Sequence, residues 1–161
     1  MTVWRDLRVE WMRLFRSKGT WLALLAASAA PLVGYGLYQP AGGGTTAALV
    51  LLNPMLTGAL GGALAFAVLT LSEMNRVKKG RMGPLTDSVV SPLRMTVVRT
   101  AVLMLTAVVS SLVTSLLYLP YTWYRLGETF QGKEYVQVVL LFLLPFLEMT
   151  VLAAAAFYQI F

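Results

Sequence analysis

Four long apolar runs constrain the fold of this chain more than any other feature. They cover residues 20–38, 49–71, 95–121 and 136–161, and a helix needs roughly 20 apolar residues to cross a bilayer. Hydrocarbon offers no water to backbone N–H and C=O groups, so such runs form helices that satisfy their own hydrogen bonds. We therefore predict an all-α fold, a polytopic transmembrane helical bundle of four spans in a single domain, residues 1–161.

The composition agrees with a membrane protein and narrows the chemistry. Hydrophobic residues make up 58% of the chain and charged residues only 12%, a balance too apolar for a soluble domain. The chain has no cysteine and no histidine, which excludes thiolate sites and removes the commonest metal ligand and general base. We expect no catalytic residue, no metal site and no cofactor.

The positive charges are placed unevenly along the chain. Eleven of the thirteen basic residues lie before the first run, in the segment between the second and third runs, or at the start of the third run. Only Arg125 and Lys133 lie elsewhere. By the positive-inside rule, the N-terminus and residues 72–94 face the cytoplasm. The net charge of +6 then serves contact with anionic membrane lipids and not with nucleic acid.

Residues 3–18 have the pattern of an amphipathic helix. One helical face carries Trp4, Leu7, Trp11, Leu14 and Phe15. Arginines occupy its flank and back, as in a helix that lies in the membrane interface. We predict an interfacial helix that leads directly into the first span.

The sequence predicts a second short helix within the polar segment 72–94, from about residue 84 to residue 91. Pro84 and Pro92 bracket it, and proline is favoured in the first turn of a helix but breaks a helix interior. Leu85 and Val89 are four residues apart, which gives the helix one apolar face to lay against lipid or a protein partner.

The outer segments carry little chemistry. Residues 39–48 include a GGGTT sequence, but no lysine follows it as a phosphate-binding loop requires. Aromatic residues from Tyr118 to Tyr124 are typical of anchors at the outer interface. The mixed charges of residues 122–135 predict a solvated loop or a small surface helix.

Within the spans, four residues are candidates for a translocation path or for helix contact. Gly58 and Gly62 would let another helix approach closely. Asn53 precedes a proline that tightens or kinks the second span. Glu148 lies near the middle of the fourth span, where a carboxylate either lines a path or holds helices together in protonated or hydrogen-bonded form.

In this order, the elements resemble the membrane subunits of type 2 ATP-binding-cassette (ABC) exporters. Residues WRDLRVEWMRLFRSKGTWLALL look like the family's interfacial elbow helix, and the segment between spans two and three looks like its coupling segment. There, Gly83 is followed nine residues later by Pro92 and then by Arg94, and the basic Arg99 opens span three. The family has six spans, so the chain resembles its N-terminal four.

The resemblance implies a permease subunit that passes a lipid-like, peptide or drug-like substrate outward across the bacterial cytoplasmic (inner) membrane. It implies a separate cytoplasmic ABC ATPase and a second permease half, identical or different, as partners. The coupling residues it implies are Gly83, Leu85, Asp87, Val89, Pro92 and Arg94.

Two other functions fit parts of the sequence. A noncatalytic membrane scaffold or accessory subunit would use the same central segment to recruit a cytoplasmic partner without transport. A membrane enzyme acting on lipids would need Glu148, Asp87 or Glu73 as acid or base, but no span contains a pair of carboxylates.

Overall fold

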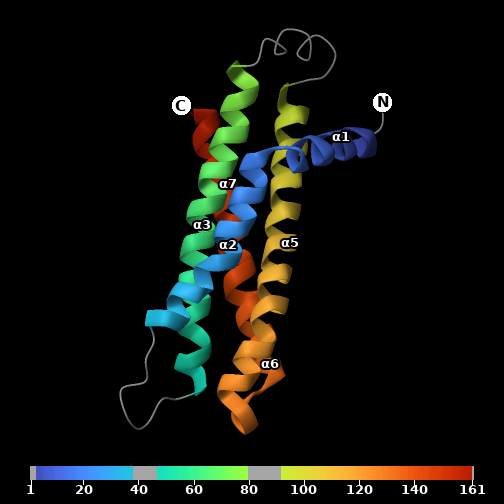
Figure 1. Ribbon diagram of the computed structural model, residues 1–161. Coiled ribbons are helices and arrows are strands. Elements are labelled where there is room, and N and C mark those ends of the chain that lie inside the picture. Colours follow the sequence, from blue (N-terminus) through green and yellow to red (C-terminus); the bar gives the residue numbers. More distant parts are fainter. Residues whose placement is uncertain (1–2, 38–46, 80–91, 161) are drawn as a thin grey trace.

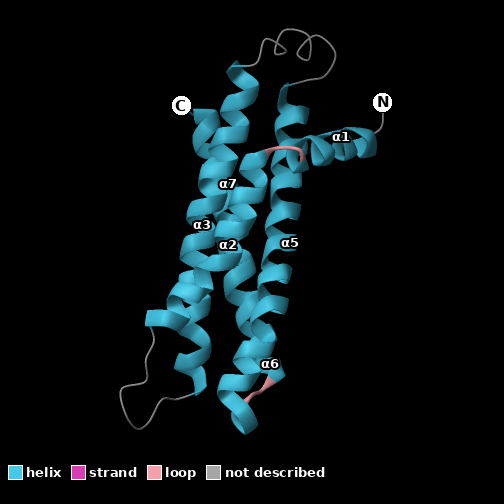
Figure 2. Ribbon diagram, viewed as in Figure 1, coloured by secondary structure: helices cyan, strands magenta, loops and turns pink. Residues whose placement is uncertain are grey.

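The computed structural model describes residues 3–37, 47–79 and 92–160. All regular elements in these ranges are helices, and none is a strand (Figure 2), so the all-α prediction is confirmed there. The long helices are α2 (Lys18–Leu37), α3 (Ala47–Lys79), α5 (Pro92–Leu126) and α7 (Leu144–Ile160). They run side by side, and α1 (Val3–Phe15) crosses α5 at a steep angle (Figure 1).

Three helices of the described part are long and apolar enough to cross a membrane. They are Leu52–Arg76, Leu93–Tyr124 and Gly132–Ile160, with mean hydropathies of 1.8, 2.1 and 2.4. Helix α2, expected as the first span, is not one of the three. The length and composition of these three helices therefore support the membrane character of the chain. The predicted count of four spans is not confirmed.

Helices α3 and α5 extend further than the apolar runs. Helix α3 continues past residue 71 to Lys79, because the polar residues that follow include good helix formers and no proline or glycine until Gly80. Helix α5 starts at Pro92, which suits the first helical position, and the predicted helix at 84–91 lies outside the described residues.

The segment 122–135 is mostly helical. Helix α5 continues to Leu126, a 3₁₀ turn follows at Gly127–Thr129, and α6 begins at Gly132 and ends at Val138. Gly127 has a φ of 54°, a left-handed conformation that glycine adopts without a Cβ clash and that commonly ends helices. Most of the segment thus belongs to the end of α5 and the start of the helix that runs to Ile160, which differs from the solvated loop or small surface helix expected here.

A wide helical turn joins α6 to α7. Val139–Leu143 form a π-helix, in which the Leu144 N–H donates to the Val139 carbonyl. Pro145 follows directly, and in a regular α-helix its ring would clash with the carbonyl four residues earlier. The wide turn accommodates the proline, so residues 132–160 remain one helix.

Small residues let α2 and α3 approach closely. A Cβ atom built at Gly58 would lie 2.7 Å from Pro31 Cγ, and one at Gly61 would lie 2.5 Å from Ala30 Cβ. Side chains at these positions would force the helices apart. Close packing through small residues is the usual way in which helices associate in lipid, where no hydrophobic force drives them together.

The turn between α1 and α2 is held by side chains. The buried Thr20 hydroxyl donates to the Leu14 carbonyl at 2.7 Å, and the Trp21 indole N–H donates to the Phe15 carbonyl at 2.9 Å. Both acceptors belong to the last turn of α1, whose carbonyls have no partner within the helix. These bonds help to hold α1 at its steep angle to the bundle.

Candidate functional site

The side of α1 that faces the bundle carries acidic residues. Asp6 and Glu10 are four residues apart and therefore lie on one helical face. Glu10 is only 5% exposed, and Leu14, one turn further on the same face, is 2% exposed. Helix α1 thus buries the Glu10 carboxylate together with an apolar residue, and Asp6 on the same face is half-buried.

Two arginines of α5 meet these carboxylates. The Arg94 guanidinium donates to Asp6 with Nη2 and Oδ2 2.5 Å apart, and the Arg99 guanidinium donates to Glu10 with Nε and Oε1 3.3 Å apart. Both arginines lie in the first turns of α5, and both carboxylates come from α1. The N-terminal end of α5 is therefore tied to α1 at two points.

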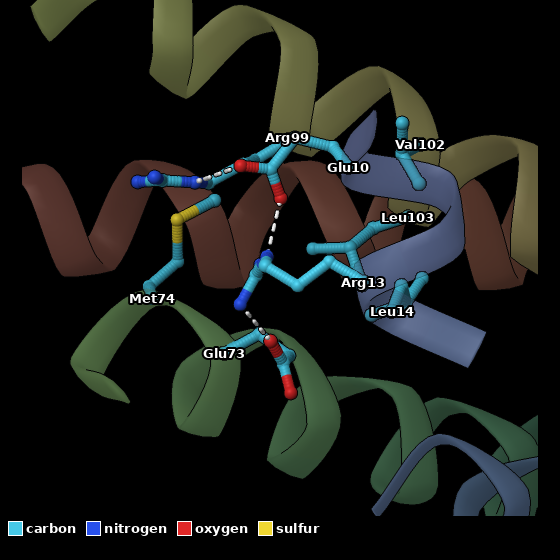
Figure 3. Close-up of a pocket in the computed structure, with 8 residues that line it drawn as sticks. All are labelled: Glu10, Arg13, Leu14, Glu73, Met74, Arg99, Val102 and Leu103. Atoms are coloured by element: carbon cyan, nitrogen blue, oxygen red, sulfur yellow. Dashed lines mark hydrogen bonds and ion pairs between the residues drawn. The ribbon is translucent and has the colours of Figure 1, made fainter. Parts of the chain in front are cut away.

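The ion pairs continue onto α3, as Figure 3 shows. Arg13 of α1 lies between two carboxylates: its Nε is 2.6 Å from Glu10 Oε2, and its Nη1 is 3.0 Å from Glu73 Oε2. The second approach is an ion pair without hydrogen-bond alignment. Arg76 Nη1 lies 3.8 Å from the other oxygen of Glu73.

We call this network the charged clamp. Its members are Asp6, Glu10, Arg13, Glu73, Arg76, Arg94 and Arg99. They come from α1, α3 and α5, and positive and negative groups alternate from Arg99 to Arg76. The clamp cross-links three helices that the turns of the chain alone would not hold together.

The centre of the clamp is shielded from water. The side chains of Glu10 and Glu73 are 7% and 6% exposed, and that of Arg99 is 14% exposed. Charges buried to this degree are costly unless they are paired and hydrogen-bonded. Glu10, Glu73 and Arg99 therefore depend on their partners, and removal of a partner would leave a buried, unbalanced charge.

The centre of the clamp leaves no room for a substrate. The space enclosed there measures about 10 Å³ and is also lined by Leu14, Met74, Val102 and Leu103 (Figure 3). Such a volume holds at most a single water molecule. The described residues also contain no group of three acidic, histidine or cysteine side chains that could hold a metal ion. The arrangement can join and position helices, but it does not form a reaction chamber.

The clamp lies at the end of the bundle where α3 ends and α5 begins (Figure 1). Glu73 and Arg76 are in the last turns of α3, whereas Arg94 and Arg99 are in the first turns of α5. These turns form the two helical ends of the predicted coupling segment, residues 72–94. A displacement of either helix end would consequently act on α1 through short ionic contacts.

The structure describes only part of the predicted coupling set. Gly83, Leu85, Asp87 and Val89 lie outside the described residues. Pro92 is the first residue of α5, and Arg94 is bound to Asp6 within the chain.

The predicted interfacial residues of α1 do not share one environment. Leu14 is buried, Leu7, Trp11 and Phe15 are half-buried, and Trp4 is 76% exposed. The single apolar face expected from the sequence is thus divided. Its Leu7 and Leu14 edge packs on the bundle, and its Trp4 edge remains outside.

The glycines of α3 lie at helix contacts. Gly58 meets Pro31 of α2, and a Cβ at Gly62 would lie 2.8 Å from Leu147 Cδ2 of α7. Of the two roles expected for these glycines, their surroundings favour helix contact. Asn53 takes part in a hydrogen bond within α3 through its backbone: the Thr57 hydroxyl donates to the Asn53 carbonyl at 3.3 Å and to the Pro54 carbonyl at 2.9 Å.

Glu148 is half-buried on α7, and its carboxylate makes no hydrogen bond or ion pair with any described residue. We expect Glu148→Gln to leave the free energy of unfolding in detergent within about 0.5 kcal/mol of the parent, because no contact is lost. Glu134→Gln, at an exposed position of α6, is the matched control. A loss well above that of the control would instead show that the carboxylate holds helices together.

Sequence reasoning missed the clamp. The available signal was the four-residue spacing of Asp6 and Glu10 in a helix that is otherwise basic. The apolar face of α1 is the stronger signal in the sequence, and only that face was predicted to make contacts. Glu73, considered as an acid or base, is instead held in ion pairs by Arg13 and Arg76.

A buried line of hydroxyl groups on α5 was also missed. It consists of Thr106, Ser110, Thr114, Tyr118 and Thr122, at four-residue intervals. Tyr118, expected as an interface anchor, is 6% exposed and donates to the Ser28 carbonyl of α2 at 2.8 Å. Thr106 and Thr122 donate to carbonyls of their own helix. This line therefore serves helix packing, while Trp123 and Tyr124 remain exposed.

Comparison of the chain with protein-family models, with curated protein sequences and with solved structures found no match.

Proposed function

We propose that this chain is the membrane subunit of an ATP-driven exporter, coupled through residues 72–94 to a separate cytoplasmic ATPase. The observation that carries the proposal is the charged clamp, which joins α1 to the end of α3 and the start of α5, the two helix ends that lie within that segment. A subunit driven from the cytoplasm needs such a connection, because a displacement of the coupling segment reaches the membrane spans only if the adjoining helices move together as a rigid body.

In this proposal the chain lies in the bacterial inner membrane with its N-terminus in the cytoplasm. Helix α2 is a further span, which completes four with the three long apolar helices. The distribution of arginine and lysine supports this orientation. Helix α1, crossing the bundle at the cytoplasmic end, then lies along the membrane surface.

The mechanical step follows from the contacts. When the ATPase closes on ATP, it displaces residues 80–91 and with them the adjoining ends of α3 and α5. Glu73 and Arg99 pass this displacement to Arg13 and Glu10 of α1, and the hydrogen-bonded turn at Thr20 passes it to α2. The chain supplies no catalytic group in this scheme, since ATP is hydrolysed on the partner.

The substrate class follows from the resemblance and remains broad: a lipid-like, peptide or drug-like molecule. The described part of one chain presents packed helices at Gly58 and Gly62. A path for substrate would consequently lie between this chain and a second permease half.

Copurification tests the coupling. The chain is tagged and extracted from membranes under mild conditions, and the mass of the native complex is measured. The same measurement is made on a double variant that carries Leu85→Asp and Val89→Asp. We expect an ATPase to copurify with the parent and to be lost from the double variant, because two carboxylates destroy the apolar docking face. Thr86→Asp with Ser88→Asp adds the same charge off that face and should retain the ATPase.

Two results would contradict the proposal. If no ATPase accompanies the parent, the exporter has no motor. The second result is a cytoplasmic protein that copurifies with the chain but does not bind ATP, in a complex whose native mass is the same with and without ATP. The chain would then be a membrane scaffold that recruits this protein without transport.

A further inference from the structure

A groove lies between α1 and α5, separate from the clamp. It is lined by Trp4, Leu7, Arg8 and Trp11 of α1 and by Val102 and Leu105 of α5, and its volume is about 230 Å³. Apart from Arg8, the lining side chains are all apolar or aromatic. The groove exists because α1 crosses α5 at a steep angle and cannot pack along its length (Figure 1).

The groove leaves large apolar side chains uncovered. Trp4 is 76% exposed and Leu105 is 49% exposed, whereas Val102 is 2% exposed and forms part of the groove's inner wall. Val102 and Leu105 belong to Leu93–Tyr124, one of the helices long enough to cross a membrane. In a bilayer, the groove therefore opens toward acyl chains, and the tryptophans of α1 lie at the interface that tryptophan prefers.

Arg8 differs from the arginines of the clamp. Arg13, Arg76, Arg94 and Arg99 are each paired with a carboxylate of this chain. Arg8 is exposed and makes no ion pair with any described residue. A guanidinium beside an apolar groove matches a phosphate attached to a hydrocarbon chain, because its planar donors suit phosphate oxygens.

We infer that this groove binds an anionic phospholipid, with one acyl chain along Val102 and Leu105 and its phosphate on Arg8. The lipid fills the space under α1 and covers Trp4. The inference depends on the membrane character of the chain and not on its coupling to an ATPase, so either can fail without the other.

Quenching of tryptophan fluorescence by brominated lipid tests this site. Trp11, Trp21 and Trp123 are replaced by phenylalanine, which leaves Trp4 as the only reporter. Phenylalanine keeps an aromatic ring in the groove at position 11, and unfolding of the variant in detergent, compared with the parent, checks that loss of the Trp21 hydrogen bond leaves the fold intact. The variant is reconstituted into phosphatidylcholine vesicles that contain a small fraction of acyl-brominated phosphatidylglycerol or, separately, of acyl-brominated phosphatidylcholine. We expect the relative affinity at Trp4 to favour phosphatidylglycerol by about fivefold, the effect of one favourable cation near an anionic lipid.

Three controls make the assignment specific. Arg8→Gln should abolish the preference, whereas Arg5→Gln, which removes an exposed arginine of the same helix outside the groove lining, should retain most of it. A second reporter protein that keeps only the exposed Trp123 measures ordinary lipid contact and should show little preference. Leu105→Trp should fill the groove and reduce contact with lipid at Trp4. Because this substitution adds a second tryptophan, contact at position 4 is measured by ¹⁹F NMR with 5-fluorotryptophan placed at that position.

Three outcomes would overturn the inference. Equal quenching by both lipids, unchanged by Arg8→Gln, would show that Trp4 meets only ordinary surrounding lipid. Absence of quenching by either lipid would show that protein covers the groove. Loss of the preference upon addition of glycerophosphate would show that Arg8 binds a free anion instead of a lipid held by its acyl chain.

Discussion

Glu10→Ala is expected to lower the free energy of unfolding by about 3 kcal/mol, because it removes the carboxylate shared by Arg13 and Arg99. Breaking a buried ion pair from one side typically costs about 3–5 kcal/mol. The lower end applies here, since Arg13 is one-third exposed and can regain some water. The measurement is unfolding of the purified protein by sodium dodecyl sulfate in mixed micelles, followed by circular dichroism.

Two further variants separate the buried pair from a general effect of charge. Glu134→Ala removes an exposed carboxylate of α6 and should cost less than about 0.5 kcal/mol. Glu10→Met combined with Arg99→Met should recover much of the loss, because it replaces both members of the buried Glu10–Arg99 pair with side chains that can pack and leaves Arg13 paired with Glu73. Glu10→Ala and Glu134→Ala with equal effects would show that the clamp contributes nothing to stability.

Gly34→Ala is expected to destabilise the protein by about 2 kcal/mol, within the range for overpacking of a close contact. A Cβ at this position of α2 would lie 2.7 Å from Pro54 Cα and 3.2 Å from the Asn53 carbonyl oxygen. Both atoms belong to the backbone of α3, so they cannot turn away as a side chain could. The two helices must separate locally, and the resulting shift in midpoint can be read from the same unfolding titration.

Two other glycines provide matched controls. At Gly62 the nearest atom to a new Cβ would be Leu147 Cδ2 at 2.8 Å, the movable end of a side chain, so Gly62→Ala should cost less than Gly34→Ala. At Gly19 the nearest atom would be Ser17 Oγ at 3.5 Å, and alanine should be neutral or slightly stabilising through its helix propensity. The account of α2–α3 packing is wrong if Gly34→Ala proves as stable as Gly19→Ala.

The contribution of the clamp to stability and its proposed use in coupling can be measured separately. If Glu10→Met with Arg99→Met folds well and retains the proposed ATPase partner but no longer responds to ATP, the ionic connection transmits movement. If this double variant responds as the parent does, the clamp only holds α1 in place, and the movement passes through the turn between α1 and α2.

The sequence by itself determined the helical elements. Apolar runs of about 20 residues must be helical in lipid because they have to satisfy their own backbone, and the amphipathic period predicted a helix that the structure places at Val3–Phe15. Proline also acted locally: Pro92 begins α5, and Pro145 follows a π turn. These features depend on neighbours within a turn or two along the chain.

Only the tertiary structure decided which helical faces meet. The four-residue spacing of Asp6 and Glu10 places them on one side of α1, but it does not indicate that Arg94 and Arg99 of α5 lie opposite. Likewise, the spacing of Gly58 and Gly62 marks a surface for close packing without naming Pro31 and Leu147 as its neighbours. The physical reason is that helix rotation and crossing angle are set by the packing of all helices at once, whereas periodicity describes each helix alone.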